Sequence, residues 1–206
     1  AILSRYPIDS AAMRDLSGIL WRDVPDALLP VDEAGQPFPS VEAQGIQRLT
    51  SVGHWIVPIK VPGGLLHLMP FHAAPHVFDG PEDRNGRRNH DEVRLWQHVL
   101  DGRFGPAPQE RFVILGGATI DPVDGGGRKG AIRALLADPR LSDPRPLRPG
   151  PVPPQPNRKG DARLHTVDWP APGPGPLRVD YVLPSADWVV VDAAVHWPPP
   201  GADGHE

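Results

Sequence analysis

Residues that can perform acid–base chemistry stand in or just after the apolar runs of this chain. His72 lies near the end of the run Leu65–Ala73, Asp180 lies within Leu177–Ser185, and a loop with Thr119 and Asp121 follows a third run. Histidine titrates near neutral pH, so an imidazole can give a proton to a leaving group. Loops at strand ends commonly carry such residues. We therefore treat these positions as candidates for chemistry.

Each candidate also has a purely structural interpretation. A histidine at a strand end is often bonded to a loop carbonyl, and Asp180 could pair with Arg178 or Arg128. The charged loop before Asn89 carries Arg84, Arg87 and Arg88. These arginines form either a solvated loop or a basic rim for a phosphate-bearing ligand. In the second case Arg88 and Asn89 are candidate substrate-binding residues.

Composition limits the possible classes of protein. The 206 residues suffice for one sizeable domain, and 29 prolines and 22 glycines predict many loops. The formal net charge of −4 predicts no general nucleic-acid-binding surface, so any such contact would be a local patch. The chain has no cysteine, which excludes disulfides and thiolate metal sites. No run has the length of a membrane span, and no signal-peptide pattern is present.

Several elements can be predicted around the candidates. The runs His54–Val61 and Leu65–Ala73, joined by Pro62-Gly63-Gly64, predict a hairpin. Asn89–Leu100 has an apolar stripe and predicts a helix with Asn89 as its N-cap. Phe112–Leu115 predicts a buried strand that opens into the glycine-rich loop, and Arg128–Ala137 predicts the next helix.

The remaining regions show weaker sequence patterns. Ala1–Ile8, Leu177–Ser185 and Trp188–Trp197 are expected to be strands, and Ser40–Leu49 a short helix capped by Ser40. Asp138–Thr166 is rich in proline and predicts a long irregular loop. The start inside an apolar run without Met and the polar C-terminal tail lead us to expect part of a longer protein.

Four segments occur in an order that resembles a known superfamily. They read SRYPI at 4–8, FHAAP at 71–75, GGATIDP at 116–122 and RVDYVLPS at 178–185. Together they resemble the endonuclease/exonuclease/phosphatase superfamily, which has the fold of pancreatic deoxyribonuclease. The resemblance implies an α+β fold, a two-sheet β-sandwich flanked by helices in four αββα layers. It covers 1–206 as a single domain that lacks the usual N-terminal and C-terminal segments and is thus incomplete at both ends.

The resemblance also implies roles for individual residues. His72 would donate a proton to the departing oxygen, and Asp180 would orient a second histidine from a Ser-Asp-His segment that this sequence lacks. The active-site loop would comprise Gly117, Thr119 and Asp121. Gly117 stands where the superfamily has Asp, and Thr119 where it has Asn. The implied cofactor is Mg²⁺ or Mn²⁺, but no residue can be assigned confidently as a metal ligand.

Two functional hypotheses follow from the resemblance. The first is a metal-dependent phosphoester hydrolase, of the phosphodiesterase or nuclease type, that is impaired by Gly117 and Thr119. Its partner would be a phosphoester substrate, with nucleic acid among the candidates. The second is a non-catalytic relative that acts as a binding or structural module, and an incompletely folding gene fragment is a weaker third alternative. The sequence predicts neither substrate, compartment nor oligomeric state.

Overall fold

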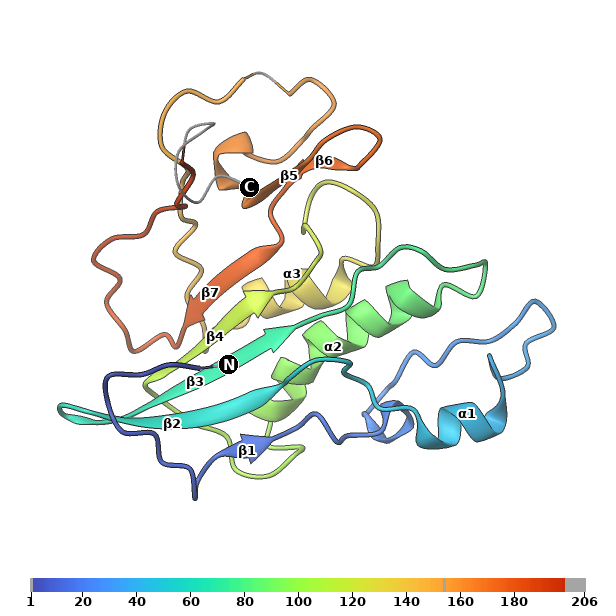
Figure 1. Ribbon diagram of the computed structural model, residues 1–206, viewed down its shortest axis with the longest axis horizontal. Coiled ribbons are helices and arrows are strands. Elements are labelled where there is room, and N and C mark those ends of the chain that lie inside the picture. The colour runs from blue at the N-terminus through green and yellow to red at the C-terminus, as the bar shows by residue number, and fades with distance from the viewer. Residues whose placement is uncertain (1, 154, 199–206) are drawn as a thin grey trace.

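The structure is a computed structural model and describes residues 2–153 and 155–198. Its strands form two sheets, one with five strands in the order β1-β2-β3-β4-β7 and one with two strands, β5-β6. The bounds of the large sheet's strands are Arg14–Asp15 (β1), Trp55–Val61 (β2), Gly64–His72 (β3), Phe112–Gly117 (β4) and Asp180–Pro184 (β7). Helices α2 (Arg84–Leu100) and α3 (Gly130–Leu136) lie together behind the large sheet (Figure 1). The predicted α+β class is confirmed.

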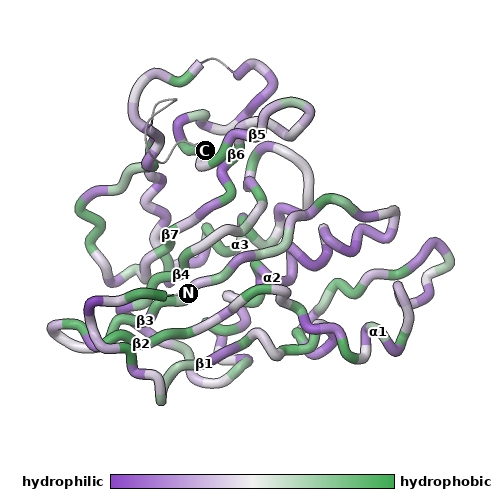
Figure 2. Tube along the Cα trace, in the orientation of Figure 1, coloured by the Kyte–Doolittle hydropathy of each residue, from purple (hydrophilic) through white to green (hydrophobic). Residues whose placement is uncertain are grey.

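The predicted hairpin is confirmed as β2 and β3. The two strands pair antiparallel from Val57 with Leu68 to Val61 with Gly64. Gly63 in the connecting turn has a φ of +84°, a conformation that glycine adopts without steric cost. Hydrophobic residues concentrate in the strands of the large sheet, whereas the N-terminal part of α2 is hydrophilic (Figure 2).

Helix α2 connects β3 to β4, which run parallel and therefore need a crossover connection. The helix begins at Arg84, five residues before the start expected at Asn89. Its first turn is stabilised by Asp79, whose Oδ2 accepts the Asn85 N–H at 2.5 Å. The prediction of Asn89 as N-cap is therefore wrong, and this residue lies inside the helix with its side chain buried.

The hydrophobic core lies between the large sheet and these two helices. Met69 and Phe71 of β3, and Ile114 of β4, pack in one cluster with Trp96 of α2 and Ile132 of α3. The alternation along each strand explains this, because residues two apart share one face of a sheet. Helix α3 falls within the range predicted for it, Arg128–Ala137.

Two short helical segments lie outside this layer. Helix α1 (Val41–Ile46) begins after Ser40, whose Oγ accepts the Ala43 N–H at 3.1 Å, so the predicted cap is confirmed. A 3₁₀ turn, η1 (Trp21–Asp23), precedes it.

The predicted strand Leu177–Ser185 is divided in two. Strand β6 (Gly175–Leu177) pairs with β5 (Val167–Trp169) in the small sheet, and β7 starts only at Asp180. The break occurs because the Arg178 N–H is bonded to Asp121, outside any ladder. The predicted irregular region Asp138–Thr166 is confirmed in its described part, with one 3₁₀ turn, η2 (Ala162–Leu164).

Two predicted terminal strands are wrong for the described residues. Trp188–Trp197 contributes only a single bridge, between Ala194 and Leu147, and Val189 and Val191 are 85% and 93% exposed. Of Ala1–Ile8, only Ile8 forms a bridge, with Ile59, and Ala1 lies outside the described residues. These apolar runs lack a neighbouring strand along their length, and a strand forms only with a paired neighbour.

Candidate active site

Three adjacent strands bring the two predicted catalytic residues together. His72 at the end of β3 is paired with Gly117 of β4, and Gly117 is paired with Asp180 at the start of β7. Directly paired residues project from the same face of a sheet. The imidazole and the carboxylate are both exposed on that face, with the glycine between them.

The absence of a side chain at Gly117 determines the geometry of this row, which consists of His72, Gly117 and Asp180. A Cβ atom placed on Gly117 would lie 2.7 Å from Nδ1 of His72 and 3.3 Å from Oδ1 of Asp180. The imidazole and the carboxylate therefore converge over Gly117 and occupy the space that a side chain would take. Asp180 pairs neither with Arg178, which binds Asp143, nor with Arg128, which binds Asp83.

Gly116 is required for β3 and β4 to approach at this end. Its φ is +142°, and a Cβ atom at this position would lie 1.9 Å from the carbonyl oxygen of Phe71. Any other residue would collide with the backbone of β3, so Gly116 is what allows the strand ends to approach. Gly116 lies just past the predicted strand Phe112–Leu115, and the observed strand continues through it to Gly117.

The loop after β4 is fixed by its own polar residues. Thr119 has a φ of +54°, and its hydroxyl donates to the carbonyl of Ala73. Asp121 is buried, and its Oδ1 accepts the N–H groups of Val123 and Asp124 at 2.7 Å each. Its Oδ2 accepts the Arg178 N–H at 2.8 Å. Asp121 therefore shapes the loop, since both carboxylate oxygens are bonded to backbone.

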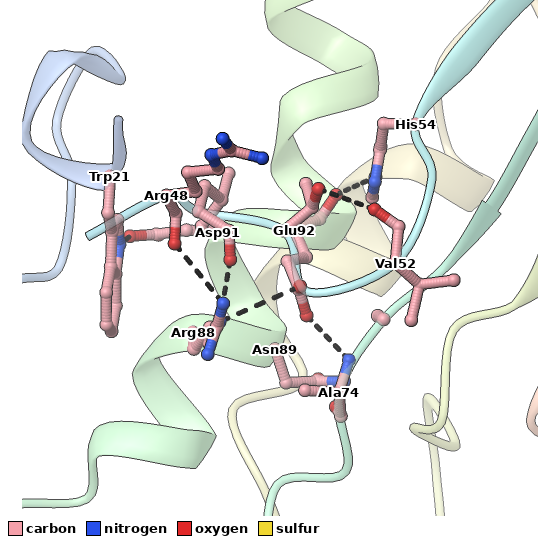
Figure 3. Close-up of polar contacts among 12 residues, drawn as sticks. Trp21, Arg48, Val52, His54, Ala74, Arg88, Asn89, Asp91 and Glu92 are labelled. Atoms are coloured by element: carbon pink, nitrogen blue, oxygen red, sulfur yellow. Dashed lines mark hydrogen bonds and ion pairs between the residues drawn. The ribbon is translucent and has the colours of Figure 1, made fainter. Parts of the chain in front are cut away.

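Two side chains of α2, Asn89 and Glu92, bond to the backbone that follows the strand ends, and Figure 3 shows both beside Ala74. Asn89 donates from Nδ2 to the carbonyl oxygens of Ala74 and Ala118, at 2.7 and 2.8 Å. Glu92 accepts the Ala74 N–H on Oε2 at 2.6 Å. Ala74 lies two residues after His72 and Ala118 directly follows Gly117, so these bonds couple the helix to the positions of both.

The two predicted substrate-binding residues make contacts inside the protein. Arg88 donates from Nε to Leu49 O at 2.6 Å and lies 3.8 Å from the Glu92 carboxylate (Figure 3). Asn89 is buried, with its amide N–H groups bonded as described above. Their role in substrate binding stays a prediction, while the contacts assign Asn89 a positioning role.

Sequence reasoning missed Glu92 and His54. Burial raises the pKa of Glu92 to about 7 and lowers that of His54 to about 4. Nε2 of His54 lies 3.1 Å from the backbone carbonyl oxygen of Glu92 (Figure 3). A signal for Glu92 exists in the sequence, because Asn89, Glu92 and Trp96 share the helical face that carries the apolar stripe.

The described part of the chain contains neither a metal-ligand cluster nor a helix that could cross a membrane. In residues 2–153 and 155–198, no group of three or more histidine, aspartate or glutamate side chains is placed to hold a metal ion. Nor does any helix there combine the length and the apolarity that crossing a bilayer requires.

Solved structures with a similar fold were found, although a search of curated proteins gave no match. Sphingomyelinase C from Streptomyces griseocarneus has a TM-score of 0.51 and 15% identity, over 88% of this chain and 50% of that chain. A β-hairpin deletion mutant of beta toxin from Staphylococcus aureus has a TM-score of 0.46 and 13% identity, over 72% of this chain and 50% of that one. At identities this low a likeness shows the fold alone, and only the first match, with its TM-score of 0.51, supports that.

This chain spans half the length of these two structures. The match to sphingomyelinase C agrees with the predicted deoxyribonuclease-like fold. A model of the Endonuclease/Exonuclease/phosphatase family matches residues 1–203, nearly the whole chain. The chain therefore belongs to the endonuclease/exonuclease/phosphatase family.

Proposed function

We propose that the exposed row at the ends of β3, β4 and β7 is the active-site position of a phosphoester hydrolase. The observation that supports this most is the convergence of His72 and Asp180 over Gly117. These residues come from segments more than a hundred positions apart, and nothing in the core requires an exposed histidine beside an exposed carboxylate. Family membership makes phosphoesters the expected substrate class.

Hydrolysis of a phosphodiester forms a P–O bond to water and breaks the P–O bond to an alkoxide. The alkoxide is a poor leaving group, so a positioned acid accelerates its departure. In this proposal His72 gives that proton, while Asp180 orients an imidazole or a water molecule beside it. Asn89 and Glu92 act indirectly, because they hold the backbone that follows His72 and Gly117.

A divalent cation is expected for the family, but the residues described do not fit one. Mg²⁺ prefers several oxygen ligands, usually with carboxylates among them. Gly117 has no side chain, and Asp121 has both oxygens bonded to backbone N–H groups. No step is therefore assigned to a metal.

We accordingly expect negligible turnover from this chain. One missing group that stabilises a transition state costs about 3 kcal/mol, and several are replaced or lacking here. The test is hydrolysis of bis(4-nitrophenyl) phosphate by the purified chain with Mg²⁺, with Mn²⁺ and with EDTA. Turnover that EDTA abolishes and Mn²⁺ restores would contradict the expected impairment.

A second candidate function is a non-catalytic binding or structural module. The specific observation in its favour is that Gly117 and Thr119 stand at the two polar positions of the family motif, while β4 remains paired with β3 and β7 up to Gly117. The two functions differ in what happens when those side chains are supplied. A decayed hydrolase gains turnover, whereas a module that never used this position for catalysis does not.

A further inference from the structure

A cavity of about 500 Å³ lies apart from this row. It is bounded by α3, the loop after β4 and the proline-rich region around η2. None of His72, Gly117 and Asp180 lines it. Its volume is in the range of sites for small molecules, which are mostly apolar with a few well-placed polar groups.

His165 is the most unusual group in the cavity wall. Its side chain is 1% exposed, and within the described residues neither Nδ1 nor Nε2 has a hydrogen-bond partner. Burial lowers the pKa of this histidine, so the ring is neutral and offers one donor and one acceptor. A buried polar group without a partner costs free energy, so a partner that reaches this ring through a small shift of the cavity wall would be favoured.

The carboxylates around the cavity are already neutralised or bonded. Asp143 forms a two-point ion pair with Arg178, at 2.6 and 2.8 Å. Asp161 binds the side chain and the N–H of Arg163. Asp121, the third, is bonded through both oxygens to the backbone, as described above.

Two arginines at the cavity lack such partners. The guanidinium of Arg145 forms no hydrogen bond or ion pair with the described residues, and Arg133 uses only Nε, on the carbonyl of Pro122 at 2.7 Å. Both side chains belong to exposed residues that line the cavity. The cavity is therefore lined both by these two guanidinium groups, which have no carboxylate partner among the described residues, and by the apolar side chains of Leu136 and Leu164.

We propose that this cavity binds a small organic anion, with a carboxylate or phosphate head group on a compact apolar body. The head group accepts hydrogen bonds from Arg145, Arg133 and the ring N–H of His165. The apolar body lies against Leu136 and Leu164. Guanidinium groups suit both head groups because they offer paired donors in a plane.

Calorimetric titration with benzoate, phenyl phosphate and benzyl alcohol tests the proposal. The first two probes carry the alternative anionic head groups on one ring, and the third is their neutral counterpart. We expect saturable binding of at least one anion, at least tenfold tighter than benzyl alcohol. Arg145→Gln should weaken anion binding about tenfold or more, while Arg22→Gln, an exposed arginine outside the cavity, should leave it unchanged.

Ring ¹⁵N spectra of histidine-labelled protein locate the bound anion. The signal absent from a His165→Gln variant should move saturably, and that of His72 should not. If the His165→Gln variant fails to fold, the comparison of anion binding by Arg145→Gln and Arg22→Gln still tests whether the anion binds in this cavity. Equal binding of benzyl alcohol, equal weakening by both arginine variants, or no saturable binding would overturn the proposal.

Discussion

Replacing Glu92 by glutamine is expected to stabilise the protein at pH 8 but not at pH 4. Glu92 is fully buried, and burial raises its pKa from 4.5 to about 7. Between these values the folded protein holds a proton that the unfolded chain has released. The contribution of Glu92 to stability is therefore complete below pH 4.5 and is lost as the pH rises through 7.

The size of the effect follows from the pKa shift. One pH unit corresponds to 1.36 kcal/mol, so the shift of Glu92 amounts to roughly 3 kcal/mol. Glutamine has nearly the same shape, can accept the Ala74 N–H through its amide oxygen, and does not ionise. The variant therefore avoids this loss, and its advantage over the wild type should grow by roughly 3 kcal/mol from pH 4 to pH 8.

His54 has the opposite dependence in the same pH range. Its folded pKa of about 4 lies below the usual 6.5, so the unfolded chain binds the proton first and stability falls as the pH falls through this interval. In the wild type, the pH dependences that Glu92 and His54 give to the free energy of unfolding therefore partly cancel. Because His54 is present in both proteins, its effect cancels in the difference between the variant and the wild type.

The assay is urea denaturation of the wild type and Glu92→Gln at several pH values. Glu33→Gln, which changes an exposed glutamate, is the matched control and should show no such trend. A stability difference that is independent of pH would refute the reasoning, as would a Glu92→Gln variant that is less stable than the wild type at pH 8.

Two further substitutions test how the strand ends are held. Gly116→Ala should destabilise the protein by several kcal/mol, because its Cβ would lie 1.9 Å from the Phe71 carbonyl oxygen and its φ is +142°. The measurement is urea denaturation. Stability close to that of the wild type would contradict the claim that β3 and β4 can approach only with glycine at this position. Asn89→Ala removes the donors to the carbonyl oxygens of Ala74 and Ala118 and should lower the free energy of unfolding by about 2–3 kcal/mol in the same assay. A decrease below about 0.5 kcal/mol would show that these bonds do not hold the strand ends.

Elements with strong local patterns could be predicted from the sequence. The β2–β3 hairpin follows from two apolar runs around Pro62-Gly63-Gly64, and β4 from an apolar run that ends at a Gly pair. The row of His72, Gly117 and Asp180 required more than local pattern. Only the ordered family segments predicted that distant strand ends would meet, because pairing between strands is not encoded in any one of them.

Errors arose where tertiary contacts override local pattern. Trp188–Trp197 has strand-forming residues but no neighbouring strand among the described residues. The start of α2 was misplaced because Asp79, outside the helix, supplies the bond that an N-cap usually provides. Asn89 is predicted from the sequence as an N-cap, yet its amide donates to two backbone carbonyls in the interior.

The central claim is that the row over Gly117 is an active-site position that has lost its polar groups. The most direct test is hydrolysis of bis(4-nitrophenyl) phosphate by Gly117→Asp/Thr119→Asn, with Mn²⁺ and with EDTA. Asparagine tolerates the φ of +54° at position 119, and an aspartate at 117 needs the exposed His72 ring to rotate and the exposed Asp180 carboxylate to move slightly aside. Gly18→Asp adds the same carboxylate at an exposed glycine with open space and serves as the control.

The double variant should gain Mn²⁺-dependent turnover, which EDTA should abolish and an added His72→Ala substitution should remove. The Gly18→Asp control should remain as inactive as the wild type. A folded double variant with no gain, or a gain that survives His72→Ala, would contradict the claim.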